Sequence, residues 1–584
     1  MKKNVLFIVI DSVTNDILFN KSNSNLIAPF LSNLRKKSIS GDKMFSEAPY
    51  TEAALMSLLC STDTMDNGGY MERLKGKVSV LEILQSNGYK VFFNNYYPSI
   101  YPSAMVTGFD ECRYIEGFQF THLWEYRLNY FSKIYSENKL TDTELSMLCD
   151  MLEDNFKAWQ VYFNNIINKS KETAMLNNCI DLSDIDNNML LLSKEYSIFL
   201  KNKLTYLKNL LTERENHNLF KIKTYKMSDK IHNDNVRKIV MNKYIPTFKK
   251  IAKLNFKKNL KNNIFPFKKF FKSIFALDLF TTKGLLAGYK NSLFDSDLYD
   301  RIGANYDQFK CQRSFHTVSQ ELFNWIKNHK DIPWVSYVHV DDAHYNENFF
   351  TYDTDNLNII DNEFKKINSY LNSLPKDYNG SIAYDLSLLY CDTIIKNIFS
   401  FLKKENLLEN TSVVITADHG FSYYFSPVRE KYVISNYKEN YNVPFIIYSR
   451  DITPKKINGF LQTKDIPATI LDLANIPVPD CFKGKSLLTY EGNSSALLEY
   501  MGGGCPDLKR RPINIGIRTN EYFVIMDVSI NLDFSQAKLK EVYDEIKDPR
   551  EHNNLANKKN IKKEIKKEIE LIKKRYDELK KQIS

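Results

Sequence analysis

A carboxylate and an imidazole stand side by side at positions 418 and 419, just after an apolar run. The run covers residues 412–415, and the segment Thr416-Ala417-Asp418-His419-Gly420 follows it. Asp and His side chains both ligate metals, and open α/β sheets place their ligands at the C-terminal edge of the strands. Such pairs also occur in ordinary turns, so the chemistry depends on whether other segments complete the site.

The N-terminal segment offers a second carboxylate, Asp11. Residues 5–10 are six consecutive apolar residues, rich in β-branched types, and predict a strand buried on both faces. A carboxylate directly after such a strand must be solvated, paired or metal-bound, because an unpaired buried charge is very costly. The alternative is that Asp11 caps the next segment.

A hydroxyl, that of Thr51, stands at the start of a predicted helix. Pro49 keeps the residue before it extended, and residues 52–59 are strong helix formers. Thr51 is therefore expected near the N-cap, where backbone N–H groups and the helix dipole favour an anion. The alternative is that Thr51 is only a cap.

Together these segments resemble the sulfatase-like branch of the alkaline phosphatase superfamily. The resemblance continues in chain order through residues 80–89 with 108–110, 334–344, 392–420, 442–448, 464–474 and 542–556. It implies an α/β fold with a central mixed sheet sandwiched by helices, a large α-helical insertion and a small C-terminal α+β subdomain. The expected catalytic domain consists of residues 1–113 and 300–490, interrupted by the insertion at 114–299. The C-terminal subdomain is expected at 491–557 and an amphipathic helix at 558–584.

Two departures from the family pattern bear on the chemistry. Classical sulfatases have Cys at the position of Thr51, followed by x-Pro-x-Arg, and oxidise it to formylglycine; here the segment is Thr51-Glu52-Ala53-Ala54-Leu55, and Cys60 does not restore the motif. They also carry two adjacent aspartates where this chain has Asp11-Ser12. A Thr nucleophile and a single acid resemble the phosphoglycerol and phosphoethanolamine transferases, so phosphoryl chemistry is favoured.

The resemblance implies one divalent cation held by Asp11, Thr51, Asp418 and His419. Three oxygens and one nitrogen suit Mn²⁺, Mg²⁺ or Zn²⁺, and residue types do not choose among them. A bound cation lowers the pKa of a hydroxyl and neutralises phosphate charge, so Thr51 would attack phosphorus in line and form a phospho-threonine intermediate. An acceptor alcohol would then make the protein a transferase, and water a hydrolase.

Substrate-side groups are expected after a predicted strand at 335–340. His344 resembles the family histidine that contacts the ester oxygen or protonates the leaving group. The alternative is a loop histidine held by a neighbouring carboxylate. A second metal centre beginning at Asp342 and His344 would need a further histidine after residue 419, and His552 is the one present, so one metal is favoured. Asp342, Arg429 and Lys431 are the predicted substrate-binding residues, with solvated surface charge the alternative for the two cations.

The insertion contains a basic and aromatic stretch, 243–275. No acidic residue occurs from 235 to 277, and ten lysines with interleaved phenylalanines fall between Lys243 and Lys272. The stretch could lie on an anionic membrane or grip an anionic acceptor; the alternative is a helical hairpin with core aromatics. No nucleic-acid-binding motif accompanies the charge, so no nucleic acid partner is expected. The apolar stripe of 561–583 predicts a helix docked on its own domain, with a homodimeric coiled coil as the alternative.

Several features predict a cytoplasmic protein, peripheral at the inner membrane face. The residues before Asp11 are too short for a signal peptide, and no apolar stretch approaches the roughly 20 residues of a membrane span. The eight cysteines lack paired spacing, which fits reduced thiols.

We therefore expect a metal-dependent enzyme that transfers a phospho-alcohol, of the phosphoglycerol or phosphoethanolamine type, to a glycan or lipid-linked acceptor, as in cell-surface polysaccharide synthesis. Hydrolysis of a sulfate or phosphate ester on the same fold is the alternative. A non-catalytic glycan-binding scaffold ranks lowest, because every residue of the one-metal set is present.

Overall fold

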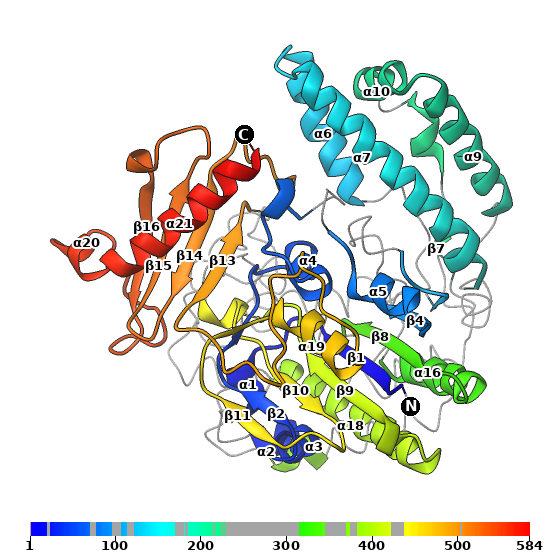
Figure 1. Ribbon diagram of the computed structural model, residues 1–584, viewed down its shortest axis with the longest axis vertical. Helices are drawn as coiled ribbons and strands as arrows, with labels where there is room; N and C mark the ends of the chain where they lie inside the picture. The colour runs from blue at the N-terminus through cyan, green and yellow to red at the C-terminus, as the bar shows by residue number, and fades with distance from the viewer. Residues whose placement is uncertain are drawn as a thin grey trace, which may run out of the picture.

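A central sheet, a group of insertion helices and a C-terminal sheet make up the described part of the protein (Figure 1). The computed structural model describes residues 2–19, 24–70, 77–95, 107–113, 122–169, 180–181, 185–213, 216–222, 226–227, 315–344, 369–373, 382–421, 437–502 and 505–583. The predicted membrane or acceptor contact at 243–275 lies outside these residues, as do Arg429 and Lys431.

The central sheet has eight strands in the order β11-β2-β10-β9-β1-β8-β4-β5. Its middle is parallel and consists of β9 (Thr411–Thr416), β1 (Asn4–Ile10), β8 (Trp334–Val340), β4 (Lys90–Asn95) and the edge strand β5 (Glu111–Arg113). The antiparallel β10 (Phe445–Tyr448) joins it to β2 (Ile39–Gly41) and β11 (Lys455–Ile457). Strands β1, β8 and β9 are buried along their whole length, which is why they are mostly apolar in sequence.

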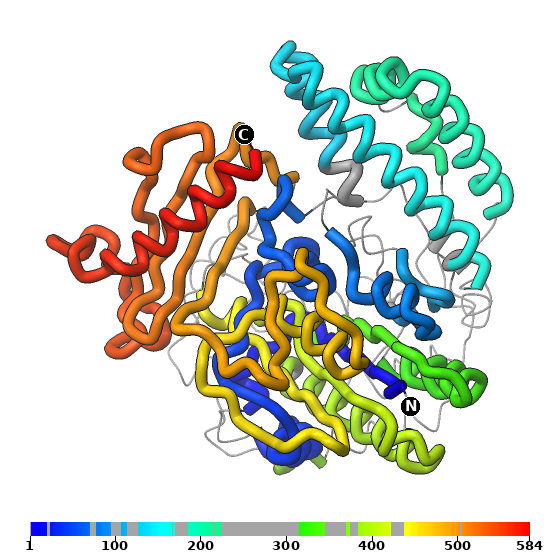
Figure 2. The backbone as a smooth tube through the Cα atoms, in the orientation of Figure 1, coloured from blue at the N-terminus to red at the C-terminus, as the bar shows by residue number. Residues whose placement is uncertain are grey.

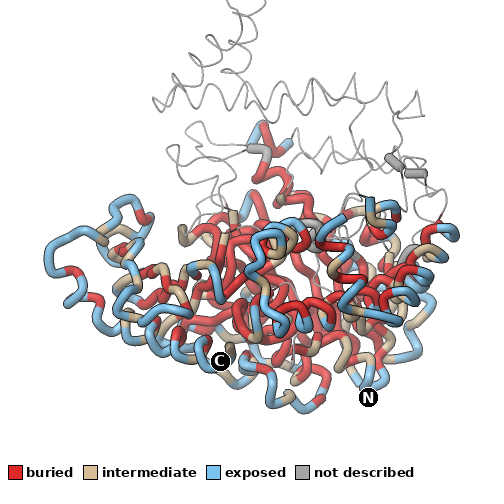
Figure 3. Tube along the Cα trace, turned by 90° about the horizontal axis from the view of Figure 1, so that it is seen from above, coloured by how far each residue is buried: buried red, intermediate tan, exposed pale blue. Residues whose placement is uncertain are grey.

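Two groups of helices flank this sheet, and they produce the buried centre seen in Figure 3. The first group contains α2 (Ser24–Ile27), α3 (Pro29–Arg35), α16 (Phe315–His329) and α18 (Ile382–Lys404), with the short α1 (Asn15–Phe19) beside α2. The second contains α4 (Thr51–Cys60), α5 (Val80–Ser86) and α19 (Asp465–Leu473). A small parallel pair, β3 (Met44–Phe45) with β12 (Leu461–Gln462), lies near this group. The predicted mixed sheet between helices is confirmed.

The described part of the insertion is mainly helical. It contains α6 (His122–Ser136), α7 (Asp142–Val161), α9 (Ile185–Lys201) and α10 (Lys203–Thr212), together with the two-residue strands β6 (Ile180–Asp181) and β7 (Lys226–Met227). The helices pack on one another and stand beside the rest of the chain, coloured cyan to green in Figure 2. None of the described helices is long and apolar enough to cross a membrane.

The C-terminal subdomain is a four-stranded antiparallel sheet with helices at the end of the chain. The strands are β13 (Ala496–Tyr500), β14 (Ile513–Arg518), β15 (Tyr522–Val528) and β16 (Lys538–Asp544), followed by α20 (Ile561–Glu564) and α21 (Lys566–Ile583). Helix α21 packs on β14 and β15, and Ile572, Tyr576 and Leu579 of its apolar stripe are buried. The stripe at 561–583 therefore contributes to the core of its own chain.

Polar contacts tie the insertion to this subdomain. The Tyr130 hydroxyl of α6 donates a hydrogen bond to Asp507 Oδ2 at 2.6 Å. Arg510 Nη1 lies 2.8 Å from Glu144 Oε1 in the first turn of α7. These contacts hold the helical insertion against the loop between β13 and β14.

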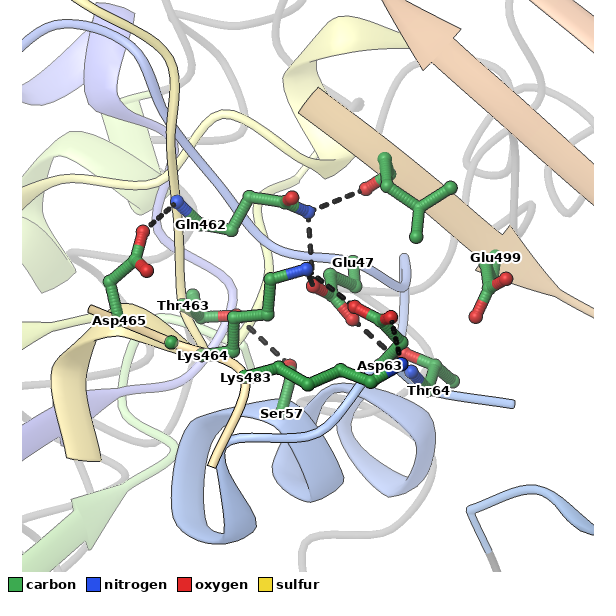
Figure 4. Close-up of polar contacts among 12 residues, drawn as sticks. Glu47, Ser57, Asp63, Thr64, Gln462, Thr463, Lys464, Asp465, Lys483 and Glu499 are labelled. Atoms are coloured by element: carbon green, nitrogen blue, oxygen red, sulfur yellow. Dashed lines mark hydrogen bonds and ion pairs between the residues drawn. The ribbon is translucent and has the colours of Figure 1, made fainter. Parts of the chain in front are cut away.

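A group of buried charges joins helix α4 to the C-terminal subdomain, and Figure 4 shows much of it. Lys464 ion-pairs with Glu47 at 2.8 Å and with Asp63, just beyond the end of α4. Lys483 lies 2.7 Å from both Asp63 and Asp66. We call this the buried ion cluster; its seven members are Glu47, Asp63, Asp66, Lys464, Lys483, Glu499 and Arg575, and Lys483, which is 36% exposed, lies at its edge.

Arg575 brings the last helix into the buried ion cluster. Its Nε and Nη2 lie 2.6 and 3.0 Å from the two carboxylate oxygens of Glu499, and its Nη1 lies 3.0 Å from Asp66 Oδ1. Because these side chains are nearly solvent-free, each ion pair must repay a large desolvation penalty, and loss of one partner is expected to be severe.

Candidate metal and catalytic site

Three neighbouring strands end at one point of the central sheet and bring together polar side chains from distant parts of the chain. In the register of the sheet, Val9 of β1 pairs with His339 of β8 and with Thr416 of β9. Side chains alternate faces along a strand, so Asp11 and Asp418, each two residues beyond its paired position, are expected on the same face as His339. The three have ligand atoms that all lie within 4.8 Å of one another.

Asp418 is fully buried, and one of its two carboxylate oxygens accepts hydrogen bonds. Its Oδ1 accepts hydrogen bonds from the backbone N–H groups of Ser12, at 3.2 Å, and His419, at 2.8 Å. Its Oδ2 has no hydrogen-bond partner among the described residues. Burial raises the pKa of Asp418 to about 7, and the negative charge of Asp11 adds to this effect. A cation beside Oδ2 would offset both the cost of burying this carboxylate and its repulsion by Asp11.

His419 presents its Nε2 to the same place. Its Nδ1 lies 2.8 Å from the carbonyl oxygen of Gly420, and since a carbonyl only accepts, Nδ1 carries the proton. Nε2 lies 3.5 Å from Asp11 Oδ1 and 3.7 Å from Asp418 Oδ2. Burial lowers the pKa of His419, but the two carboxylates raise it by more, so the net pKa is above its usual range.

Thr51 is the first residue of α4, and its hydroxyl faces the carboxylates. Tyr50 occupies the N-cap in an extended conformation without a side-chain cap. The Thr51 hydroxyl is a long hydrogen-bond donor to Asp11 Oδ2 at 3.4 Å and lies 3.3 Å from His419 Nε2. The side chain therefore points to Asp11 and His419 rather than capping the helix.

Ser12 fixes the geometry of the turn after β1. It adopts the left-handed conformation, with φ 63°, which non-glycine residues rarely do. Its hydroxyl donates to Asp11 Oδ1 at 2.8 Å, and its carbonyl accepts from the Tyr384 hydroxyl at 2.6 Å. The strained turn thus aims the Asp11 carboxylate and the Ser12 N–H at the site.

The donor set fits a divalent cation. Two atoms that ligate one tetrahedral ion at about 2.1 Å lie roughly 3.4 Å apart. The separations among Asp11, Thr51, Asp418 and His419 given above run from 3.3 to 3.7 Å. The carboxylates of Asp11 and Asp418 are both buried, with ligand atoms within 4.8 Å of each other, and they repel unless a positive charge joins them. The four residues predicted as ligands are thus brought together, as the prediction of one divalent cation requires.

His339 is a polar residue of this site that sequence reasoning passed over. It is fully buried near the end of β8, and its Nε2 lies 4.0 Å from Asp11 Oδ2 and 3.9 Å from Asp418 Oδ2. Burial lowers its pKa to about 4, so the ring is neutral. The available signal was an imidazole inside a buried, mostly apolar strand.

The structure places His344 near His419, whereas Asp342 is bound to the start of α16. His344 is partly exposed, and its ring centre lies 6.3 Å from that of His419. Asp342 is fully buried, and both its oxygens accept from the backbone N–H of Phe315 at the start of α16. Burial raises its pKa to about 7. The predicted substrate-binding roles of Asp342, Arg429 and Lys431 stay predictions.

The fold and the site together define an α/β protein in which buried carboxylates and imidazoles that could hold a metal ion face a hydroxyl at a helix N-terminus. A sequence model of the sulfatase family matches residues 3–181 and 209–476, well over half of the chain. The chain belongs to the sulfatase family. A second model, described as N-sulphoglucosamine sulphohydrolase, C-terminal, matches residues 431–582.

Individual relatives match over shorter stretches. Arylsulfatase K of Rattus norvegicus is 30% identical over 141 residues, covering 21% of this chain and 25% of that protein. The ulvan-active sulfatase of Formosa agariphila is 30% identical over 164 residues, covering 26% of this chain and 30% of that protein. The matched segments thus span only a quarter to a third of these relatives. A Bacteroides thetaiotaomicron protein assigned to the sulfatases aligns in structure over 100% of this chain and 93% of its own, with 13% identity and a TM-score of 0.50, which supports the fold.

Proposed function

We propose that this protein is a metal-dependent hydrolase of sulfuric or phosphoric esters in which Thr51 is the nucleophile. The observation that carries the proposal is the position of the Thr51 hydroxyl, 3.4 Å from Asp11 Oδ2 and 3.3 Å from His419 Nε2, at the N-terminus of a buried helix. The first backbone N–H groups of a helix lack partners within it and favour an anion. An ester anion bound there would present its central atom to Oγ1.

Each chain residue has a defined task in the proposed reaction. A bound divalent cation supplies positive charge that lowers the pKa of the hydroxyl and offsets the charge of the ester oxygens. Thr51 Oγ1 forms a bond to phosphorus or sulfur, its proton passes to Asp11 Oδ2, and the bond to the alcohol oxygen breaks. His344 gives the departing alcohol a proton. Water then attacks the Thr51 ester and loses a proton to His344, and Oγ1 leaves with the proton from Asp11.

Glycan esters are the proposed substrate class. The support comes from the match of residues 431–582 to the N-sulphoglucosamine sulphohydrolase model and from the similarity to the ulvan-active sulfatase. The residue at the nucleophile position limits the route: a threonine side chain cannot become formylglycine, so the covalent ester must be released by a second attack at its central atom. This requirement is met more readily at phosphorus.

Transfer to an alcohol is a second outcome of the same chemistry. A phospho-threonine formed at Thr51 would react with a hydroxyl of glycerol or of a sugar in place of water, giving the transferase activity expected from the resemblance of Thr51 and Asp11 to phospho-alcohol transferases. Hydrolysis is preferred because the family relatives of this chain are sulfatases.

The test uses the full chain with nitrophenyl sulfate, nitrophenyl phosphate and a nitrophenyl phosphodiester. Thr51→Ala should reduce turnover by about 10⁴-fold or more, as loss of a nucleophile does, whereas Thr51→Ser should keep part of it. Accurate mass of the trapped protein should place a phosphate- or sulfate-derived adduct on Thr51 itself. Added glycerol distinguishes transfer from hydrolysis through a new glycerol ester.

Thr62→Ala is the matched control, because Thr62 is also buried, just after α4, but outside the site. Near-normal turnover by Thr51→Ala, or an adduct on another residue, would contradict the nucleophile assignment. Absence of turnover with every ester class, from a protein with the metal bound, would contradict the hydrolase.

A further inference from the structure

His339 lies against the two carboxylates of the site. Its Nε2 is 4.0 Å from Asp11 Oδ2 and 3.9 Å from Asp418 Oδ2. Both separations exceed the range of an N–H···O hydrogen bond, about 2.7–3.2 Å. They are nevertheless close for fully buried polar groups, and Asp418 Oδ2 has no hydrogen-bond partner among the described residues. A space of this size between two carboxylates and an imidazole suits an ion.

The other side of the His339 ring is anchored by a hydroxyl. Its Nδ1 lies 3.1 Å from the hydroxyl of Tyr337, two residues earlier on β8. If Nδ1 carries the proton and donates to Tyr337, the lone pair of Nε2 points toward the carboxylates. Metal-ligating histidines commonly donate their second ring N–H in this way, which fixes the tautomer and the orientation of the ring.

We propose that His339 Nε2 is a ligand of the cation held by Asp11 and Asp418, and that it determines which metal the site selects. With His419 and Thr51, the set contains two imidazoles, two carboxylates and one hydroxyl. Imidazole suits Zn²⁺ and related transition ions, whereas Ca²⁺ and Mg²⁺ prefer sets made of oxygen alone. The site therefore selects Zn²⁺-like ions over Ca²⁺ and Mg²⁺. This inference rests on the cation of the proposed function but not on the catalytic step.

The experiment measures metal binding by the full chain, without turnover. Metal-free protein is titrated calorimetrically with Zn²⁺, Mn²⁺, Mg²⁺ and Ca²⁺. Wild type should bind Zn²⁺ more tightly than Mg²⁺ or Ca²⁺. His339→Phe keeps the ring shape and removes the nitrogen, so Zn²⁺ affinity should fall at least about 100-fold; Tyr337→Phe should cost about 10- to 100-fold, as other outer-shell changes do.

Two further measurements guard against a misfolded variant. His339→Gln offers an oxygen near the position of Nε2 and should narrow the preference for Zn²⁺ over Mg²⁺. Pulsed EPR of the Mn²⁺-loaded protein reports directly bound imidazole nitrogens and should show two in wild type, one of them lost in His339→Gln. His344→Asn is the control, since the nearby His344 is outside the proposed ligand set.

The outcomes separate this inference from the proposed function. Unchanged Zn²⁺ affinity in His339→Phe, or a single bound nitrogen in wild type, would overturn the role of His339 while leaving a metal-dependent hydrolase intact. Tight Zn²⁺ binding through His339 together with full turnover by Thr51→Ala would overturn the proposed nucleophile and leave the role of His339 intact. A wild-type protein that binds none of the four ions would overturn both.

Discussion

Replacing Arg575 with methionine should detach the C-terminal helix from the rest of the protein. Arg575 is 4% exposed and makes a bidentate ion pair with the fully buried Glu499, at 2.6 and 3.0 Å. It also lies 3.0 Å from Asp66 Oδ1 and 3.4 Å from Asp63 Oδ2. Removing one partner of a buried pair typically costs about 3–5 kcal/mol, because the remaining charge stays buried and uncompensated.

The charge balance of the buried ion cluster decides where in that range the loss falls. Four carboxylates face three cations, so the variant leaves four against the two lysines Lys464 and Lys483. Burial already raises the pKa of Glu499 above its usual range, so this carboxyl can take up a proton once Arg575 is gone. Methionine also keeps the apolar part of the side chain. Both effects favour the lower end, about 3 kcal/mol.

Hydrogen exchange of the full chain is the assay. A loss of about 3 kcal/mol corresponds to roughly 100-fold faster exchange of the amides in β13 and α21 that open with this subdomain. Lys574→Met, on the exposed side of the same helix, is the matched control and should leave exchange unchanged. Less than threefold acceleration in Arg575→Met, or equal acceleration in the control, would refute the reasoning.

Three further predictions concern the site and the insertion. Gly420→Ala should weaken metal binding and lower the melting temperature in thermal unfolding, because a Cβ there would overlap the carbonyl oxygen of Glu439; a variant with wild-type values would show that the loop can shift freely. Chelation should lower the melting temperature, since the buried carboxylates of Asp11 and Asp418 then repel without a cation, and a melting curve unaffected by chelator would count against the metal site. Acid should weaken the contact between the insertion and the C-terminal subdomain. Burial raises the pKa of Glu144, but hydrogen bonds from Arg510 and Thr141 lower it by more, so the net pKa is about 2 instead of the ordinary 4.5. A lowered carboxyl pKa stabilises the folded state above pH 4.5 and loses that effect as the pH falls toward 2, so exchange in α7 should accelerate in this window, and Glu144→Gln should remove the pH dependence.

Short-range patterns are enough to predict much of the active-site framework. The six apolar residues before Asp11 and the run at 412–415 are parts of strands buried on both faces, and such strands are rich in apolar residues. The helix at 51–60 follows from its helix-forming residues. The ends of these elements therefore indicate Asp11, Thr51 and Asp418 as candidate site residues from local sequence alone.

The sequence by itself determined which residues could form the site, because elements of regular periodicity reveal where polar groups interrupt buried segments. Only the tertiary structure decided which of them meet. Through the register of β8 against β1 it placed His339 Nε2 4.0 Å from Asp11 Oδ2 and 3.9 Å from Asp418 Oδ2, and it assigned both oxygens of Asp342 to the start of α16. It also joined Arg575 to Glu499, residues 76 positions apart. Such pairings depend on long-range packing, which local patterns in a chain do not encode.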